Sequence, residues 1–236
     1  MRIGLYGGAF NPVHNGHMAV ARAALQAAKL DRLIFIPSGN APHKAETHIS
    51  RDDRFNMLRL AIKDEIKMEI SDYELKRTEV SYSADTAEYF KSVYKKDELF
   101  FIIGDDSYND LSSWHEPQRI TAVCTLLVFP RNGAEILPPA VEIQMKPVHI
   151  SSSNIRERIK NGKDVKNLLP KAVFDYIINK TTGNIVKGDK TTFRYGMYKM
   201  EFIRKIGVKT SDSINTVQCP NCGAKTQITV SGKCEY

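Results

Sequence analysis

The sequence has no long hydrophobic run. No apolar stretch approaches the ~20 residues that a helix needs to span a bilayer. The N-terminal apolar run, residues 2–6, breaks at Gly7, which is too early for a signal peptide. These absences predict a cytoplasmic protein without a membrane partner. With 236 residues, of which 42% are hydrophobic and 26% are charged, the chain has the composition of a soluble globular protein with one full domain and a smaller part.

The main body of the chain also lacks an excess of either charge. The net charge is +7, but residues 181–236 hold nine Lys and Arg against four Asp and Glu, which leaves a net charge of only +2 in residues 1–180. A nucleic-acid-binding domain carries its basic residues as a patch on the domain itself. We therefore expect no nucleic-acid partner.

Cysteine is scarce, with four residues in the chain. Cys124 borders an apolar run and is interpreted as a core residue. Cys219 and Cys222 form a C-x-x-C pair, and Cys234 follows at a distance typical of a zinc ribbon. A fourth ligand would fall just beyond Tyr236. The pattern predicts a partial Zn²⁺ site. Three alternatives stay open: weak binding by the three thiolates, binding completed by a His or water ligand, and a metal-free state.

Apolar runs bounded by turn residues alternate with helix-period stretches up to about residue 180. The predicted strands are residues 2–6, 32–37, 98–104, 125–130 and 146–151. The predicted helices are residues 17–29, 51–64, 83–96 (with Ser83 as N-cap), 152–162 (ending at Gly162) and 169–180 (with Pro170 in its first turn). This pattern predicts an α/β domain with a doubly wound parallel sheet over residues 1–180, followed by a small β-rich extension over residues 181–236. Its ligand should bind beyond the carboxyl ends of the strands.

The stretch "GGAFNPVHNGH", residues 7–17, lies between the first strand and the first helix. Gly7 and Gly8 let a ligand approach the backbone, and the helix start favours an anion. His14 and His17 are three residues apart, so both can face the same anion as two removable positive charges. The stretch matches neither the Walker lysine motif nor the dinucleotide fingerprint G-x-G-x-x-G. A metal site and a purely structural role remain alternatives for the two histidines.

This stretch resembles the signature of the H-x-G-H nucleotidyltransferases, in the form found in bacterial nicotinate-mononucleotide adenylyltransferases. Five further stretches are similar to that family in the expected order: "IPSGNAPHK" (36–44), "RFNMLRLAI" (54–62), "SYSADTAEYF" (81–90), "FIIGDDSYNDLSSWHE" (101–116) and "ISSSNIR" (150–156). The resemblance covers essentially all of residues 1–180. It implies the Rossmann-like nucleotidyltransferase fold and transfer of the ATP adenylyl group to nicotinate mononucleotide, with release of pyrophosphate and with Mg²⁺ carried by ATP.

The resemblance also implies which residues form the site. The catalytic residues would be His14, His17 and Arg156. ATP would be bound by Gly8, Ala9, Phe10, His14, His17, Gly104, Asp106, Ile150, Ser151, Ser152 and Arg156. Nicotinate mononucleotide would be bound by Asn40, Lys44, Ser83, Thr86, Trp114 and Arg131. Many relatives carry Thr where this chain has Ser83, and the hydroxyl is retained.

Each of these assignments has a structural alternative. Asp106 follows a strand and could cap a helix, Trp114 could pack in the core, and Lys44 could be a solvated surface residue. Ser151 and Ser152 could be an ordinary N-cap run. Two other functions remain alternatives. One is a scaffold protein that binds nucleotide without turnover, and the other is transfer to pantetheine phosphate, whose enzymes share only the first and last motifs. The oligomeric state is left open, with a homo-oligomer as one alternative.

Residues 181–236 resemble the end of bacterial Tim44-like proteins with their zinc ribbon. Most of the Tim44-like domain and the last cysteine of that pattern are missing. The resemblance implies no role for this segment in adenylyl transfer.

Overall fold

The computed structural model describes residues 1–40, 49–131, 133, 135–182, 217–218 and 225–226. The chain divides into two compact units, Met1–Phe202 and Ile203–Tyr236. The predicted boundary near residue 181 stays a prediction. In the second unit, β7 (Val217–Gln218) pairs antiparallel with β8 (Lys225–Thr226). Cys219, Cys222 and Cys234 lie outside the described residues.

The first unit is built on a six-stranded sheet with the order β3-β2-β1-β4-β5-β6, in which every neighbouring pair is parallel. The strands are β1 (Arg2–Gly8), β2 (Arg32–Pro37), β3 (Met68–Ile70), β4 (Glu98–Gly104), β5 (Thr125–Phe129) and β6 (Val141–Glu142). The order reverses direction between β1 and β4. This is the doubly wound arrangement that the alternating pattern predicted, and its ligand site is expected at this switch point.

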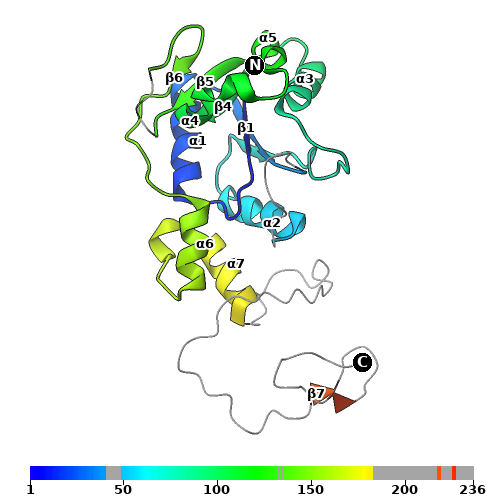
Figure 1. The fold of residues 1–236 in the computed structure, drawn as a ribbon, viewed down its shortest axis with the longest axis vertical. Helices are drawn as coiled ribbons and strands as arrows, with labels where there is room; N and C mark the ends of the chain where they lie inside the picture. Colours follow the sequence, from blue (N-terminus) through cyan, green and yellow to red (C-terminus); the bar gives the residue numbers. More distant parts are fainter. Residues whose placement is uncertain (41–48, 132, 134, 183–216, 219–224, 227–236) are drawn as a thin grey trace. The chain divides into compact units, whose positions relative to one another are not determined.

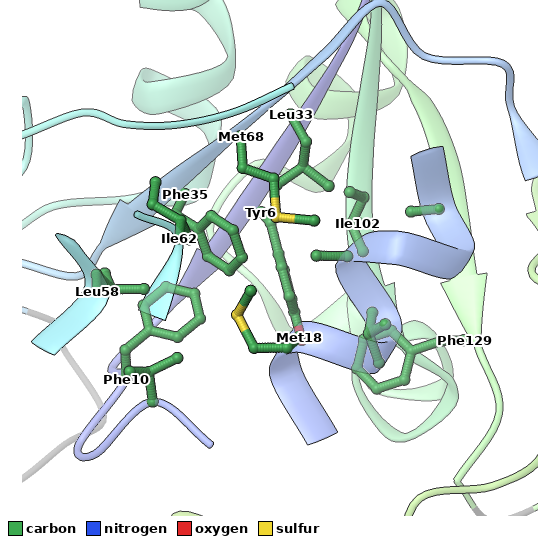
Figure 2. Close-up of a cluster of buried hydrophobic side chains, with 14 of the residues drawn as sticks. Tyr6, Phe10, Met18, Leu33, Phe35, Leu58, Ile62, Met68, Ile102 and Phe129 are labelled. Carbon is green, nitrogen blue, oxygen red and sulfur yellow. The ribbon is translucent and has the colours of Figure 1, made fainter. Parts of the chain in front are cut away.

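Helices cover both faces of the sheet (Figure 1). The seven described helices longer than a single 3₁₀ turn are α1 (Asn15–Ala27), α2 (Arg51–Ala61), α3 (Ser83–Val93), α4 (Asp105–Asn109), α5 (Pro117–Val123), α6 (Ser152–Lys160) and α7 (Lys171–Thr182). Successive strand residues point to opposite faces. Tyr6 and Phe35 therefore pack with α1 and α2, whereas Leu5 and Ile34 pack with α3 and α5. Figure 2 shows Tyr6 and Phe10 among buried side chains on the α1 and α2 face of the sheet, which include Met18, Phe35 and Leu58.

Two local predictions are wrong. Residues 146–151 form no strand, because the edge position beside β5 is taken by β6, where Val141 is the partner of Leu127. The N-cap of α3 is Tyr82 in extended conformation, and Ser83 is the first helical residue. The predicted helix end at Gly162 is confirmed, since this glycine follows the C-cap of α6 with a φ of 65°.

Two strands and two helices were not predicted: β3, β6, α4 and α5. Among the described residues, no helix combines the length and the apolar character needed to cross a membrane.

Candidate active site

A cleft of about 970 Å³ opens at the carboxyl edge of the sheet, where β1 and β4 end. Most of the predicted site residues line it. They are Gly8, Ala9, Phe10, His14, His17, Ser83, Thr86, Gly104, Asp106, Trp114, Arg131, Ser151, Ser152 and Arg156. Residues that are up to 148 positions apart in sequence therefore share one cavity at the predicted switch point.

His14 and His17 hold the start of α1 together. The Nδ1 atom of His14 accepts a hydrogen bond from the backbone N–H of His17 at 3.3 Å, and Nδ1 of His17 accepts one from the N–H of His14 at 3.2 Å. The two imidazoles stack with their centroids 3.7 Å apart. Because each Nδ1 is an acceptor, the neutral imidazoles carry their protons on Nε2. The structural and the functional interpretation of this pair are therefore compatible.

Of the two removable positive charges predicted for this pair, the one on His14 is lost well below neutral pH. His14 is buried, and burial together with the nearby charge of Arg131 lowers the pKa of its imidazole to about 4. Near neutral pH, His14 is uncharged, and it can offer a neutral N–H donor to a phosphate oxygen.

The glycines at the end of β1 have different surroundings. A Cβ at Gly8 would lie 3.0 Å from the ring of Phe10, whereas a Cβ at Gly7 would have no atom within 4 Å. Phe10 itself has a φ of 46°, in the left-handed region. Gly8 thus leaves room for Phe10 to fold back over the strand end, and Gly7 keeps the backbone open to the cleft.

Arg156 and Ser152 connect α6 to the β1–α1 loop. The Nη1 group of Arg156 donates to the carbonyl of Asn11 at 2.7 Å, and the Ser152 hydroxyl donates to the carbonyl of Pro12 at 2.9 Å. Ser151 caps α6 by accepting from the N–H of Asn154. The serine–arginine segment therefore lies directly against the histidine loop, and the guanidinium retains further donors beyond its contacts with Asn11 and Ser153.

Asp106 follows β4 and lies close to Gly104. Its Oδ2 atom pairs with Arg131 at 3.0 Å, and its Oδ1 accepts from the N–H of Ser107. A Cβ at Gly104 would lie only 2.4 Å from Oδ1 of Asp106. Glycine at this position therefore lets the carboxylate fold back over the strand end. The hydrogen bond from the Ser107 N–H to this carboxylate shows that Asp106 also stabilises the start of α4.

Thr86 lies on the opposite wall of the cleft, in the first turns of α3. Its hydroxyl donates to Oε1 of Glu74 at 2.7 Å, and Oε2 of Glu74 accepts from the N–H of Gly39 at 3.2 Å. Burial raises the pKa of Glu74, against the opposing effect of these two donors and of the charges of Arg77 and Arg54. Glu74 and Ser81 also line the cleft, and neither was predicted as a site residue from the sequence.

Trp114 lines the same wall and packs partly buried against the cluster beneath α3 and α5. Beside it, the rings of Tyr82 and His115 lie 4.1 Å apart. The next residue, Glu116, has a left-handed φ of 47° and pairs with Arg119 at 2.6 Å. Arg119 also binds Asp85 and Glu88 of α3. An ion-pair network therefore fastens the segment that carries Trp114 to the helix that carries Thr86.

Two of the described predicted residues, Ile150 and Asn40, do not line this cleft. Ile150 lines a small adjacent pocket that also includes His14 and Arg131. The amide of Asn40 bonds to two other segments: Nδ2 donates to the carbonyl of Thr78, between β3 and α3, and Oδ1 accepts from Arg51 of α2. Lys44 lies outside the described residues. Across the part of the chain that the structure describes, no cluster of three or more His, Cys, Asp or Glu side chains is arranged to hold a metal ion.

Known proteins are similar to the greater part of this chain. Residues 5–158 match the family model described as Cytidylyltransferase-like. A protein of Clostridium acetobutylicum named "Probable nicotinate-nucleotide adenylyltransferase" is 37% identical over 188 residues, which cover 73% of this chain and 94% of that protein. A protein of the same name from Borreliella burgdorferi is 41% identical over 181 residues, which cover 75% of this chain and 94% of the relative.

A similar fold is found among solved structures. The Plasmodium falciparum nicotinic acid mononucleotide adenylyltransferase complexed with NaAD aligns with a TM-score of 0.67 at 21% identity, over 76% of this chain and 96% of that one. At this level of identity the likeness concerns the fold.

Proposed function

Because the chain belongs to the nicotinate-nucleotide adenylyltransferases within the cytidylyltransferase-like family, it transfers the adenylyl group of ATP to nicotinate mononucleotide in NAD biosynthesis, and we propose how its cleft performs this reaction. The products are nicotinate adenine dinucleotide and pyrophosphate. The proposal rests on one observation above all: Arg156 and Ser152 contact the same loop that carries His14 and His17.

The triphosphate of ATP binds between this loop and the start of α6. Nε2–H of His14 and His17, the guanidinium of Arg156 and the hydroxyls of Ser151 and Ser152 are all donors, and phosphate oxygens are acceptors. Ala9 and Phe10 line the adenosine side through their backbone. Asp106 accepts from ribose hydroxyls with its carboxylate, which the ion pair with Arg131 holds beside the strand end.

The reaction needs placement and electrostatic stabilisation, without a covalent enzyme intermediate. A phosphate oxygen of nicotinate mononucleotide attacks the α-phosphorus of ATP, a new P–O bond forms, and the bond to pyrophosphate breaks with its electron pair. Negative charge grows on the transferring group and on the leaving oxygen. Donors that are already fixed in position stabilise this charge without rearrangement. His17 and Arg156 are assigned to the transition state, and His14 to the orientation of His17.

Mg²⁺ is proposed to enter bound to ATP. The residues on the triphosphate side of the cleft are N–H and O–H donors, and the carboxylate of Asp106 is paired with Arg131. This donor set fits phosphate oxygens, and it leaves the cation to the nucleotide. When bound, Mg²⁺ would neutralise charge on the β- and γ-phosphate oxygens.

Nicotinate mononucleotide binds on the side of Thr86, Ser83 and Trp114, with the Trp114 indole against the pyridine ring. Lys44 and Arg131 are proposed partners of its phosphate. The ring carboxylate would accept from backbone N–H groups that follow Trp114, since the N–H of Trp114 itself donates to the Leu111 carbonyl. Asn40 is proposed to shape this wall, because both ends of its amide are hydrogen-bonded to protein groups, Thr78 and Arg51.

Pyrophosphate release from ATP tests the assignment. The protein would be assayed with nicotinate mononucleotide, nicotinamide mononucleotide and phosphopantetheine side by side. We expect the highest kcat/KM with nicotinate mononucleotide. Faster release with phosphopantetheine would reassign the acceptor, and release with none of the three would leave a nucleotide-binding scaffold.

The extension over residues 181–236 is proposed to stand outside the reaction. Zinc binding by Cys219, Cys222 and Cys234 remains a proposal, as does a homo-oligomeric state. Metal analysis of the purified protein beside a Cys219→Ser variant tests the first of these, and light scattering tests the second.

A further inference from the structure

Glu74 is a buried carboxylate in the wall of the cleft, and adenylyl transfer as described above gives it no role. Its residue is 8% exposed, and it lies in the segment between β3 and α3. Its two carboxylate oxygens take one donor each, the Thr86 hydroxyl at 2.7 Å and the Gly39 N–H at 3.2 Å. In its ionised form the carboxylate only accepts, and the proton of the Thr86 hydroxyl then points toward Glu74.

This contact determines what Thr86 can offer to a ligand. With its proton committed, the Thr86 oxygen has only lone pairs left for the cleft, so it can accept but not donate. The neighbouring Ser81 hydroxyl is buried and has no hydrogen-bond partner among the described residues, which indicates that this corner is built for a polar group. Gly39 packs tightly against this segment, since a Cβ there would lie 2.2 Å from the backbone carbonyl oxygen of Glu74.

We propose that Glu74 is a positioning residue that orients the Thr86 hydroxyl as a hydrogen-bond acceptor for a ribose hydroxyl of the acceptor mononucleotide. The inference rests on the proposed function. Nicotinate mononucleotide carries an anionic ring carboxylate and an anionic phosphate, both of which only accept. Its ribose hydroxyls are its only strong donors, so an acceptor-only Thr86 selects that part of the molecule.

A Glu74→Gln variant tests this role with little change in shape. Glutamine can satisfy the Gly39 N–H only by turning its NH₂ group toward Thr86, which reverses the direction of that hydrogen bond and points the hydroxyl proton into the cleft. We expect KM for nicotinate mononucleotide to rise about tenfold, while KM for ATP and kcat stay within about twofold. Glu79→Gln is the matched control, since Glu79 lies on the same segment with its side chain 83% exposed.

A double-mutant cycle separates positioning from mere packing. Thr86→Val removes the hydroxyl and should raise the same KM, and Glu74→Gln should then add nothing further. The 2′-deoxy and 3′-deoxy forms of nicotinate mononucleotide complete the test, because the analogue that lacks the recognised hydroxyl should be insensitive to Glu74→Gln.

The outcomes are distinct. An unchanged KM in Glu74→Gln, additive effects in the double variant, or equal losses with both deoxy analogues would each overturn the role of Glu74, provided that the wild-type protein turns over nicotinate mononucleotide. Absence of turnover by the wild type would overturn the proposed function, and the role of Glu74 with it.

Discussion

The guanidinium of Arg156 donates a 2.7 Å hydrogen bond to the backbone carbonyl of Asn11, across 145 positions of sequence. The bond joins the start of α6 to the loop that ends in His14. A carbonyl accepts from the same planar donor that phosphate oxygens prefer, so Arg156 can hold the loop with one N–H and a ligand with another.

Replacement of Arg156 by lysine should therefore weaken both the contact with the Asn11 carbonyl and the proposed contact with the phosphates. Lysine keeps the charge but lacks the planar set of five donors. We expect kcat for pyrophosphate release to fall by about a hundredfold, in the range found when one transition-state donor is lost, and KM for ATP to rise. Arg158→Lys is the control, since Arg158 binds the Asp164 carbonyl outside the cleft. Equal effects of the two substitutions would contradict the assignment of Arg156.

Substitution of His17 by alanine removes an N–H donor and one half of the reciprocal cap of α1. We expect kcat to fall by about 10²- to 10³-fold. The loss of the cap should lower the free energy of unfolding by about 1 kcal/mol, which leaves a folded protein. Steady-state kinetics and urea denaturation measure the two effects separately. Near-normal turnover in the folded variant would remove His17 from the mechanism.

The low pKa of His14 makes the stability of the protein depend on pH. The imidazole has a pKa of about 4 in the folded protein, against 6.5 in the unfolded chain. Below about pH 6.5 the unfolded chain binds a proton that the folded protein does not, so acidification toward pH 4 destabilises the fold, while no effect arises above that range. Each pKa unit corresponds to about 1.4 kcal/mol.

A His14→Asn variant should lose this dependence, because asparagine caps a helix without titrating. Between pH 7.5 and 5, wild-type protein should lose about 2 kcal/mol more unfolding free energy than the variant. Urea denaturation at both pH values measures the difference, and His149→Asn, at an exposed position, is the control. Parallel losses in wild type and His14→Asn would show that His14 is not held neutral by burial.

Gly104→Ala should displace the Asp106 carboxylate, because the added Cβ would lie 2.4 Å from its Oδ1 atom. The conflict is with the end of a side chain, so the fold should survive. We expect KM for ATP to rise about tenfold, as for Asp106→Asn, since a lost hydrogen bond to a charged group costs about 1.5–3 kcal/mol. An unchanged KM for ATP would place Asp106 outside the nucleotide site.

The central strands of this sheet could be predicted because each one is marked by a run of neighbouring residues in the sequence. β1, β2, β4 and β5 are continuous apolar runs, and their buried positions on both faces follow from a parallel sheet. β3 and β6 contain three and two residues, too few for a periodic signal. Their pairing depends on the neighbouring strand, which no short window of sequence contains.

In the site, too, contacts between distant segments could not be predicted from the sequence, as the residues around Glu74 show. Nothing in the pattern "DYELKR" marks this glutamate as buried. Its environment comes from Gly39 and Thr86, which belong to other segments. Likewise, the low pKa of His14 depends on burial and on Arg131, so the H-x-G-H pattern located the imidazole but could not give its charge.

Because of the reciprocal cap, a substitution at His14 or His17 also changes a hydrogen bond at the start of α1. Redesign of the phosphate chemistry would therefore have to supply a new helix start together with each new side chain.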